Sequence, residues 1–342
     1  MNYAKPYLLC LLAICLCVIS HAAGKRIVVA QKGKADFNSI QAAINSLPDS
    51  SPEAVTVFIK KGTYREKIYL EKSNIILLGE DRDGTVITYP IARDEWKCDH
   101  NDDWGVATMN IDGNDITLRN ITIVNSYGFE QKSLRTIACN SDTITHTKTI
   151  LPDRSHQMAL RTIKATRLRA INCHFDSWAG DTVSPWNKET GMFYFKDCLM
   201  EGGVDFYCPR GWAYAEDCRF VARRGDAIIW HDGSAAEDSK TVLKRCTFAG
   251  YDGFKLGRYH RDAQFYLIDC TFAANMADKD IYLVPTANAI RWGRRVYYYN
   301  CHKEGTAYTW LANNLDSAPS HPDAAAINAG WVFGNNWKLI GN

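Results

Sequence analysis

The sequence lacks the short motifs that mark several common enzyme classes. It contains no GxSxG nucleophile elbow, no HExxH helix, no CxxC pair and no glycine-rich phosphate loop. Serine-triad, zinc-dependent and nucleotide-dependent chemistry therefore have little support. An excess of one charge is also missing, because 40 Lys and Arg residues against 38 Asp and Glu residues leave a net charge of +2. Nucleic acid is therefore not an expected partner.

Long apolar runs are confined to the N-terminus. Residues 1–22 carry an early lysine, an apolar run and a small-residue exit around Ser20 and Ala22. This pattern predicts a cleaved secretory signal, and the run is too short to predict a membrane span. We therefore expect a secreted or periplasmic protein whose mature part, residues 23–342, is a single domain.

Helical periodicity is scarce after the signal. One short amphipathic helix is expected after Asp36, with Phe37, Ile40, Ile44 and Leu47 on one face. Such a helix would cap the exposed sheet edge of a first coil. Beyond it, short strands rich in Val, Ile and Leu alternate with Gly, Asn and Asp turns, and no crossover helices separate them.

A repeat takes the place of the missing helices. Six times a polar residue precedes a cysteine, at intervals of about 20 to 31 residues. The six cysteines are Cys173, Cys198, Cys218, Cys246, Cys270 and Cys301. This period, with short strands and no crossover helices, predicts an all-β, right-handed parallel β-helix. A β-sandwich is the alternative fold, but it would leave the column of cysteines unexplained.

The remaining cysteines divide by position. Three of the twelve lie in the signal, and the six of the repeat are expected to form an inward column of free thiols. Cys98 and Cys139 lie in two long interruptions of the repeat, about residues 92–105 and 128–154, where repeat proteins carry binding surface. In an oxidising compartment these two are a candidate disulfide. Cys208 is left over, close in sequence to Asp205.

The first interruption also carries an acidic cluster. Asp99, Asp102 and Asp103 are candidate calcium ligands, but their spacing matches no calcium loop. A solvated loop is the preferred interpretation of this cluster.

Two aspartates hold nearly the same place in successive repeats. Asp181 follows Cys173 by eight positions, and Asp205 follows Cys198 by seven. Because adjacent coils lie about 4.8 Å apart, side chains in register on neighbouring coils touch. Two carboxyl groups at such a short distance cannot easily both ionise, so one of them stays protonated and can act as an acid. A nearby guanidinium such as that of Arg258 keeps the other carboxyl group ionised. The pattern predicts a carboxylate nucleophile beside a carboxylic acid.

The segments around these residues resemble the pectin methylesterases, parallel β-helix esterases that remove methyl groups from galacturonate esters. The similarity covers nearly all of the mature sequence, including the entry segment DFNSIQAAINSLP and the strand IKKGTYREKIYL. The family motifs QAVALR, QDTLY, VDFIFG and LGRPW match residues 157–161, 180–184, 204–209 and 256–260.

The resemblance implies a role for each matched residue. Asp205 would be the nucleophile that attacks the ester carbonyl, and Asp181 would protonate the leaving methanol and then accept a proton from water. Arg258 would hold Asp205 ionised, and Gln157 would donate a hydrogen bond to the oxyanion. The resemblance implies no metal or other cofactor and a pectic polysaccharide as substrate. A monomer is expected because the sequence shows no separate dimerisation element.

Departures from the family pattern predict a changed site. Gly180 stands where the family has a second glutamine, which removes one oxyanion donor. Ser184 replaces the aromatic residue of QDTLY, and His260 replaces the tryptophan of LGRPW. We expect an altered substrate preference and a sugar groove lined by aromatic rings. The residues expected to line it are Trp186, Tyr207, Trp230, Tyr259 and His260.

Three other interpretations remain open from the sequence. The two aspartates could cap backbone amides in turns, and Gln157 could be an internal ladder residue. A non-catalytic pectin-binding solenoid is favoured by Gly180. A calcium-dependent, pectate lyase-like enzyme would use Arg258 as its base.

Overall fold

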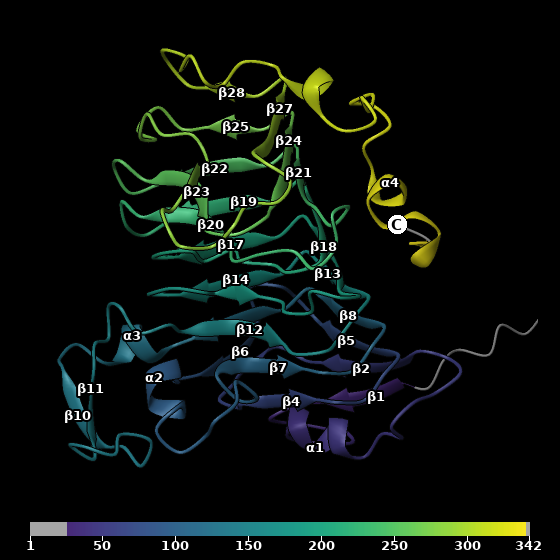
Figure 1. The fold of residues 1–342 in the computed structure, drawn as a ribbon. Coiled ribbons are helices and arrows are strands. Elements are labelled where there is room, and N and C mark those ends of the chain that lie inside the picture. Colours follow the sequence, from purple (N-terminus) through teal and green to yellow (C-terminus); the bar gives the residue numbers. More distant parts are fainter. Residues whose placement is uncertain (1–25, 340–342) are drawn as a thin grey trace, which may run out of the picture.

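The computed structural model describes residues 26–339, and the proposed signal, residues 1–22, lies outside the described part. Residues 26–339 form a parallel β-helix in which the strands of successive coils stack along one axis (Figure 1). The predicted fold is confirmed. Three faces, called sheets A, B and C here, run along the stack.

Sheet A is parallel and has ten strands, in spatial order β1 (Arg26–Val29), β2 (Val55–Ile59), β5 (Ile75–Gly79), β8 (Ile116–Arg119), β13 (Leu168–Ile171), β16 (Met192–Lys196), β18 (Trp212–Glu216), β21 (Thr241–Lys244), β24 (Gln264–Ile268) and β27 (Arg295–Tyr299). Sheet B is parallel and has nine strands, β3 (Gly62–Tyr64), β6 (Thr85–Tyr89), β9 (Thr122–Asn125), β14 (His174–Ser177), β17 (Leu199–Gly202), β19 (Arg219–Ala222), β22 (Thr247–Gly250), β25 (Thr271–Phe272) and β28 (His302–Lys303).

Sheet C has two parts joined through single bridges made by Tyr207. The four-stranded part contains β4 (Ile68–Leu70), β7 (Ala107–Ile111), β12 (Met158–Thr162) and β15 (Val183–Ser184). The three-stranded part contains β20 (Ala227–His231), β23 (Lys255–Tyr259) and β26 (Tyr282–Leu283).

The backbone conformation explains why a polar residue precedes each repeat cysteine. Where a coil turns from sheet A into sheet B, this residue adopts a positive φ, for example 49° at Asn172 and 54° at Asp217. Asn and Asp reach this left-handed conformation at lower cost than most residues that have a Cβ. The cysteine that follows points inward, and the thiol of Cys198 donates to Ala170 O of the preceding coil at 3.5 Å. All six repeat cysteines are free and buried, as expected.

Aromatic rings continue the same stacking along the core. Phe220 and Phe248 stack at 4.8 Å between ring centroids, and Phe248 meets Phe272 at 5.2 Å. Because these side chains occupy equivalent positions of successive coils, one core extends through the stack. The residue two places after each of the first five repeat cysteines, from Cys173 to Cys270, therefore belongs to this core.

The first helix, α1 (Ile40–Asn45), is shorter than expected. Its N-cap is Ser39, whose hydroxyl accepts from Ala42 N, while Asp36 accepts from Val28 N at 2.8 Å. The expected start at Asp36 was therefore wrong by several residues, because Asp36 is used to hold the strand beside it. Ile40, Ala43 and Ile44 are buried against the first coils, and the proposed capping of the sheet edge stays a prediction.

The two interruptions of the repeat project together from one side of the stack (Figure 1). They contain α2 (Arg93–Trp96), α3 (Tyr127–Glu130) and the antiparallel hairpin of β10 (Arg135–Ala138) and β11 (Thr147–Ile150). A disulfide joins Cys98 to Cys139 and confirms the predicted pair. The hairpin and α2 are therefore tied to each other covalently.

The C-terminal segment runs along the outer face of sheet A, after the last long strand β27 (Figure 1). It contains η1 (Leu315–Ser317), α4 (Ala329–Phe333) and η2 (Gly334–Asn336), and it forms a second apolar cluster with the tyrosines of that face. Trp337 is buried in this cluster, and Trp331 packs against it. Within residues 26–339, no helix has the length and apolar character needed to cross a membrane.

We predict that Phe220→Ala destabilises the protein by about 3 to 5 kcal/mol, because it opens a cavity between fully buried rings. Tyr251→Ala is the matched control, since 60% of that aromatic residue is exposed, and it should change the free energy of unfolding by about 0.5 kcal/mol or less. Urea unfolding followed by circular dichroism measures both. Equal effects of the two substitutions would contradict the continuous aromatic core.

Candidate active site

Sheet C brings the two predicted aspartates together. The bridges from Val183 to Tyr207 and from Tyr207 to Ile229 fix the register of three coils. Asp181 and Asp205 each lie two residues before a bridged residue, so they occupy the same position of adjacent coils. Both have a positive φ, 59° and 50°, which aspartate tolerates better than most residues. The positive φ at each aspartate turns the chain, and the register of the bridges places the two carboxylates on adjacent coils.

The carboxylate of Asp205 is held by Arg258 from β23. The guanidinium donates to both oxygens, Nε to Oδ1 at 3.0 Å and Nη2 to Oδ2 at 2.7 Å. Burial raises the pKa of Asp205 to about 6, since Arg258 offsets only part of the desolvation and nearby Asp181 adds repulsion. Asp205 is therefore mainly ionised at neutral pH and protonated in mild acid.

Asp181 is equally buried but is surrounded by cations. Its Oδ2 lies 3.0 Å from Nδ1 of His156, and its side chain is 14% exposed. Burial alone would raise the pKa of Asp181, but His156, Arg210 and Arg161 together lower it. The sequence predicted that one of the paired carboxyls has a raised pKa and acts as the acid. The structure raises the pKa of Asp205 and not that of Asp181, because more positive charges surround Asp181.

Two buried arginines complete this environment, and sequence reasoning missed both. Arg161 on β12 donates to Ser184 Oγ at 2.9 Å and pairs with Asp103 at 3.1 Å. Arg210 forms an ion pair with Asp232 of the next coil. The guanidiniums of Arg161 and Arg210 each lie 4.5 Å from the centroid of the Trp186 ring. The only hint of these two arginines in the sequence was the position of Arg161 at the end of the matched segment QMALR.

His156 is the third missed residue. It precedes Gln157 in the chain, and its carbonyl accepts from Arg93 N at 2.9 Å. Asp181 raises the pKa of His156 to about 9, against the opposing effect of burial. The imidazole is therefore protonated at neutral pH.

Gln157 is placed beside the pair, but its amide group already makes hydrogen bonds. Its Oε1 accepts from Gly128 N at 3.1 Å, and its Nε2 donates to Pro152 O. The side chain is fully buried. One N–H of the amide remains for an oxyanion by count of donors.

The expected aromatic lining divides into two groups. Trp186, Trp230 and His260 are partly exposed, and Trp230 lies 4.7 Å from His260 and 5.2 Å from the Arg258 guanidinium. Tyr207 and Tyr259 instead pack in the main core, with 0% and 4% of their surfaces exposed. The structure does not bring these two tyrosines to a sugar-binding surface, because Tyr207 packs against Phe195 and Phe220 and Tyr259 packs against Phe265.

The acidic residues of the first interruption do not converge on one point. Asp103 pairs with Arg93 and Arg161, whereas Asp99 accepts from Asn140. Elsewhere in the described part, His174, Asp176 and Glu201 have ligand atoms within 4.8 Å of one another. Arg223 donates to both of these carboxylates, at 2.8 and 2.6 Å, and so supplies the positive charge.

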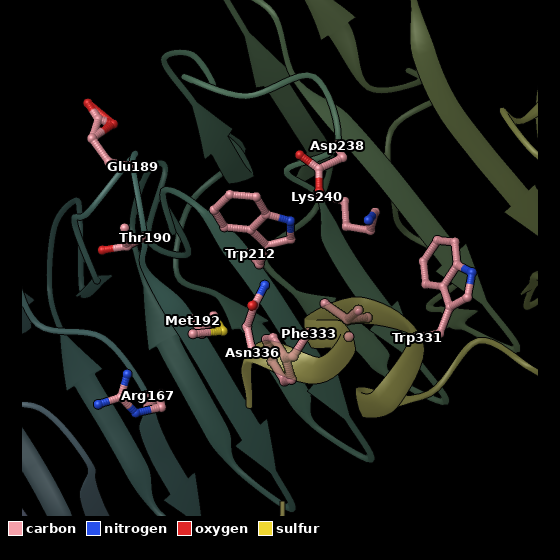
Figure 2. Close-up of a pocket in the computed structure, with 12 residues that line it drawn as sticks. Arg167, Glu189, Thr190, Met192, Trp212, Asp238, Lys240, Trp331, Phe333 and Asn336 are labelled. Carbon is pink, nitrogen blue, oxygen red and sulfur yellow. The ribbon is translucent and has the colours of Figure 1, made fainter. Parts of the chain in front are cut away.

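The cavity beside α4 lies away from the two aspartates. Its volume is about 470 Å³, and Trp212 of β18 and Trp331 of α4 line it together with Lys240 (Figure 2). It forms where the C-terminal segment covers the ends of sheet A strands. The paired carboxylates of sheet C are not among its lining residues.

We predict that Arg258→Gln raises the pKa of Asp205 above 6 by about one to three pH units, because the substitution removes the opposing charge. Arg261→Gln, on an exposed residue three positions later, is the control and should leave that pKa unchanged. Titration of the aspartate carboxyl carbons by NMR measures both. An unchanged pKa in Arg258→Gln would contradict the ion pair.

Comparisons with known proteins agree with the resemblance that the sequence motifs indicated and with the fold. Residues 26–152 match the family model described as Pectinesterase. A pectinesterase of Aspergillus niger is 25% identical over 91% of this chain and 89% of its own length. Pectinesterase 31 of Arabidopsis thaliana is 26% identical over 67% of this chain and 66% of its own length.

Solved structures share the fold. Pectin methylesterase PemA from Erwinia chrysanthemi aligns with a TM-score of 0.70 at 21% identity, over 93% of this chain and 99% of the other. A pectin methylesterase in complex with a hexasaccharide aligns with a TM-score of 0.68 at 20% identity, over 93% and 99%. These matches bear out the resemblance to pectinesterases, which are carboxylic ester hydrolases, and the solved structures share the parallel β-helix of this chain.

Proposed function

We propose that the protein hydrolyses methyl esters of galacturonate residues in pectin and releases methanol. The observation that carries the proposal is the buried Asp205 carboxylate, which Arg258 holds at both oxygens beside Asp181 of the adjacent coil. A pectin methylesterase of the same fold has been solved with a hexasaccharide. This precedent supports a pectic polysaccharide as the substrate.

In the first step, an oxygen of Asp205 attacks the ester carbonyl carbon. Arg258 keeps Asp205 ionised and oriented, so the attacking lone pair is available above about pH 6. The carbonyl oxygen gains negative charge, and Gln157, whose side chain is closed to solvent in the free protein, turns its remaining N–H toward that oxygen. Asp181 protonates the methanol oxygen as the carbon–oxygen bond breaks.

In the second step, water opens the acyl-enzyme. Asp181 accepts a proton from the water, the oxygen attacks the acyl carbon, and Asp205 leaves as a carboxylate. Protein side chains carry both steps, and the proposal includes no metal. Trp186, Trp230 and His260 are proposed to contact the sugar chain. We also propose that the protein is secreted or periplasmic and acts as a monomer.

Gly180 favours a second candidate function, a pectin-binding solenoid without catalysis. A Cβ at this position would lie 2.8 Å from Val204 O, so the backbone leaves no room for a donor side chain here. Loss of an oxyanion donor costs on the order of a hundredfold or more in rate. The lyase interpretation has less support, because it needs Arg258 as the base. The hydrogen bond to Asp205 raises the pKa of Arg258, so the guanidinium stays protonated and is a poor base.

Methanol release decides between these functions. We expect the natural protein to release methanol from highly methylated pectin in the presence of chelator, and Asp205→Asn to reduce the rate by at least about a thousandfold. Asp226→Asn is the matched control, on a more exposed aspartate of the next coil. Absence of methanol from linear and branched methylated pectins would favour the binding solenoid. Release of unsaturated product only with calcium would favour the lyase.

The pKa of Asp205 predicts the acid side of the pH profile. Because attack needs the ionised carboxylate, kcat/KM should rise with pH and level off above about 6. A pH series of methanol release measures this rise. A rate that is flat from pH 4 to pH 8 would contradict the nucleophilic role of Asp205.

A further inference from the structure

His156 lies at the exposed side of an otherwise buried carboxylate. Its Nδ1 is 3.0 Å from Asp181 Oδ2, and 46% of the His156 side chain is exposed against 14% of the Asp181 side chain. The main chain of His156 is fixed at the same place, because its carbonyl accepts from Arg93 N at the start of α2. The imidazole is thus a polar connection between solvent and Asp181.

Gly180 lies beside this ring. A Cβ on Gly180 would lie 3.5 Å from Cδ2 of His156, which is ordinary van der Waals contact, whereas it would lie only 2.8 Å from Val204 O. The backbone of the following coil therefore limits the side chain at position 180 more than the imidazole does.

The charges that face His156 favour a proton on its ring. Asp181 is in direct contact, and the Asp205 carboxylate of the following coil adds attraction for the proton. Arg93 of α2 opposes it, but Arg93 is itself paired with Asp103. Beyond Asp181 lie Arg161 and Arg210, which stabilise the anionic carboxylate and so keep the proton on the imidazole in the free protein.

We propose that His156 holds and returns the proton that Asp181 exchanges with the substrate, so that the acid of this site is a His156–Asp181 pair. The inference rests on the proposed function. His156 acts through Asp181 and is a positioning and proton-holding residue, whereas Asp181 meets the leaving group.

The proton balance of the reaction follows from this pair. During acylation, Asp205 forms a bond to the carbonyl carbon, and the bond from that carbon to the methanol oxygen breaks. The proton moves from His156 Nδ1 to Asp181 and then to the methanol oxygen, which leaves the imidazole neutral. During deacylation, the attacking water loses a proton to Asp181, and the proton returns to His156. Ester and water give acid and methanol, and the pair is restored.

The first test uses two substitutions that differ in one property. His156→Asn keeps a hydrogen-bond donor near the position of Nδ1, but its amide cannot gain or lose a proton during the reaction. His156→Ala removes both the donor and the exchangeable proton. We expect both to lower kcat for methanol release at pH 7 at least tenfold, with KM within threefold. The natural protein should lose activity as pH rises through about 9, and this alkaline limb should be absent or shifted to lower pH in His156→Asn.

His146→Asn is the control, on an exposed histidine of the hairpin that joins β10 and β11, and it should keep the natural profile. Recovery of natural activity in His156→Asn, with the alkaline limb in place, would overturn the inference. That result would mean that the hydrogen bond alone matters.

The second test does not depend on activity. NMR titration should show a His156 imidazole with a pKa near 9 in the natural protein, and Asp181→Asn should lower it by at least one pH unit. An imidazole that titrates near 6.5 in both proteins would overturn the inference even if methanol is released. A raised pKa that depends on Asp181, without methanol release from any methylated pectin, would instead overturn the proposed function.

Discussion

The register between parallel coils is the constraint on which the site depends. A side chain in sheet C has its neighbours on the coils before and after it, and these neighbours are more than twenty residues away in the chain. Asp181 and Asp205 come together because Val183, Tyr207 and Ile229 bridge in line. Arg258 reaches Asp205 because β23 pairs in register with β20. A slip of one residue would point one carboxylate into the core and break the pair.

Unequal surroundings then give two chemically identical groups different properties. Both aspartates are buried, which favours their neutral forms. Asp205 has one guanidinium partner and a raised pKa, whereas Asp181 is near His156, Arg161 and Arg210 and has a lowered one. In this account the proton needed for catalysis resides on the histidine, whose Nδ1 lies 3.0 Å from Asp181.

The sequence was informative wherever a local rule applies to each coil. A polar residue with a positive φ, then an inward cysteine and an apolar residue, recur in five successive coils from Cys173 to Cys270, and this predicted the β-helix and the adjacency of the aspartates. The disulfide followed from two cysteines outside the repeat. His156, Arg161 and Arg210 could not be predicted, because their contacts cross coils and depend on the register. Tyr207 was suggested as a sugar contact because it is aromatic, but its ring packs against Phe195 and Phe220 in the core.

The most direct test of the account is a crystal structure of the Asp205→Asn variant with a methylated hexagalacturonate. The account predicts the sugar chain across sheet C, with the ester carbonyl carbon about 3 to 3.5 Å from the side chain at position 205 and the methoxy oxygen facing Asp181. An oligosaccharide bound elsewhere, for example in the cavity between Trp212 and Trp331, with sheet C free of sugar, would contradict it.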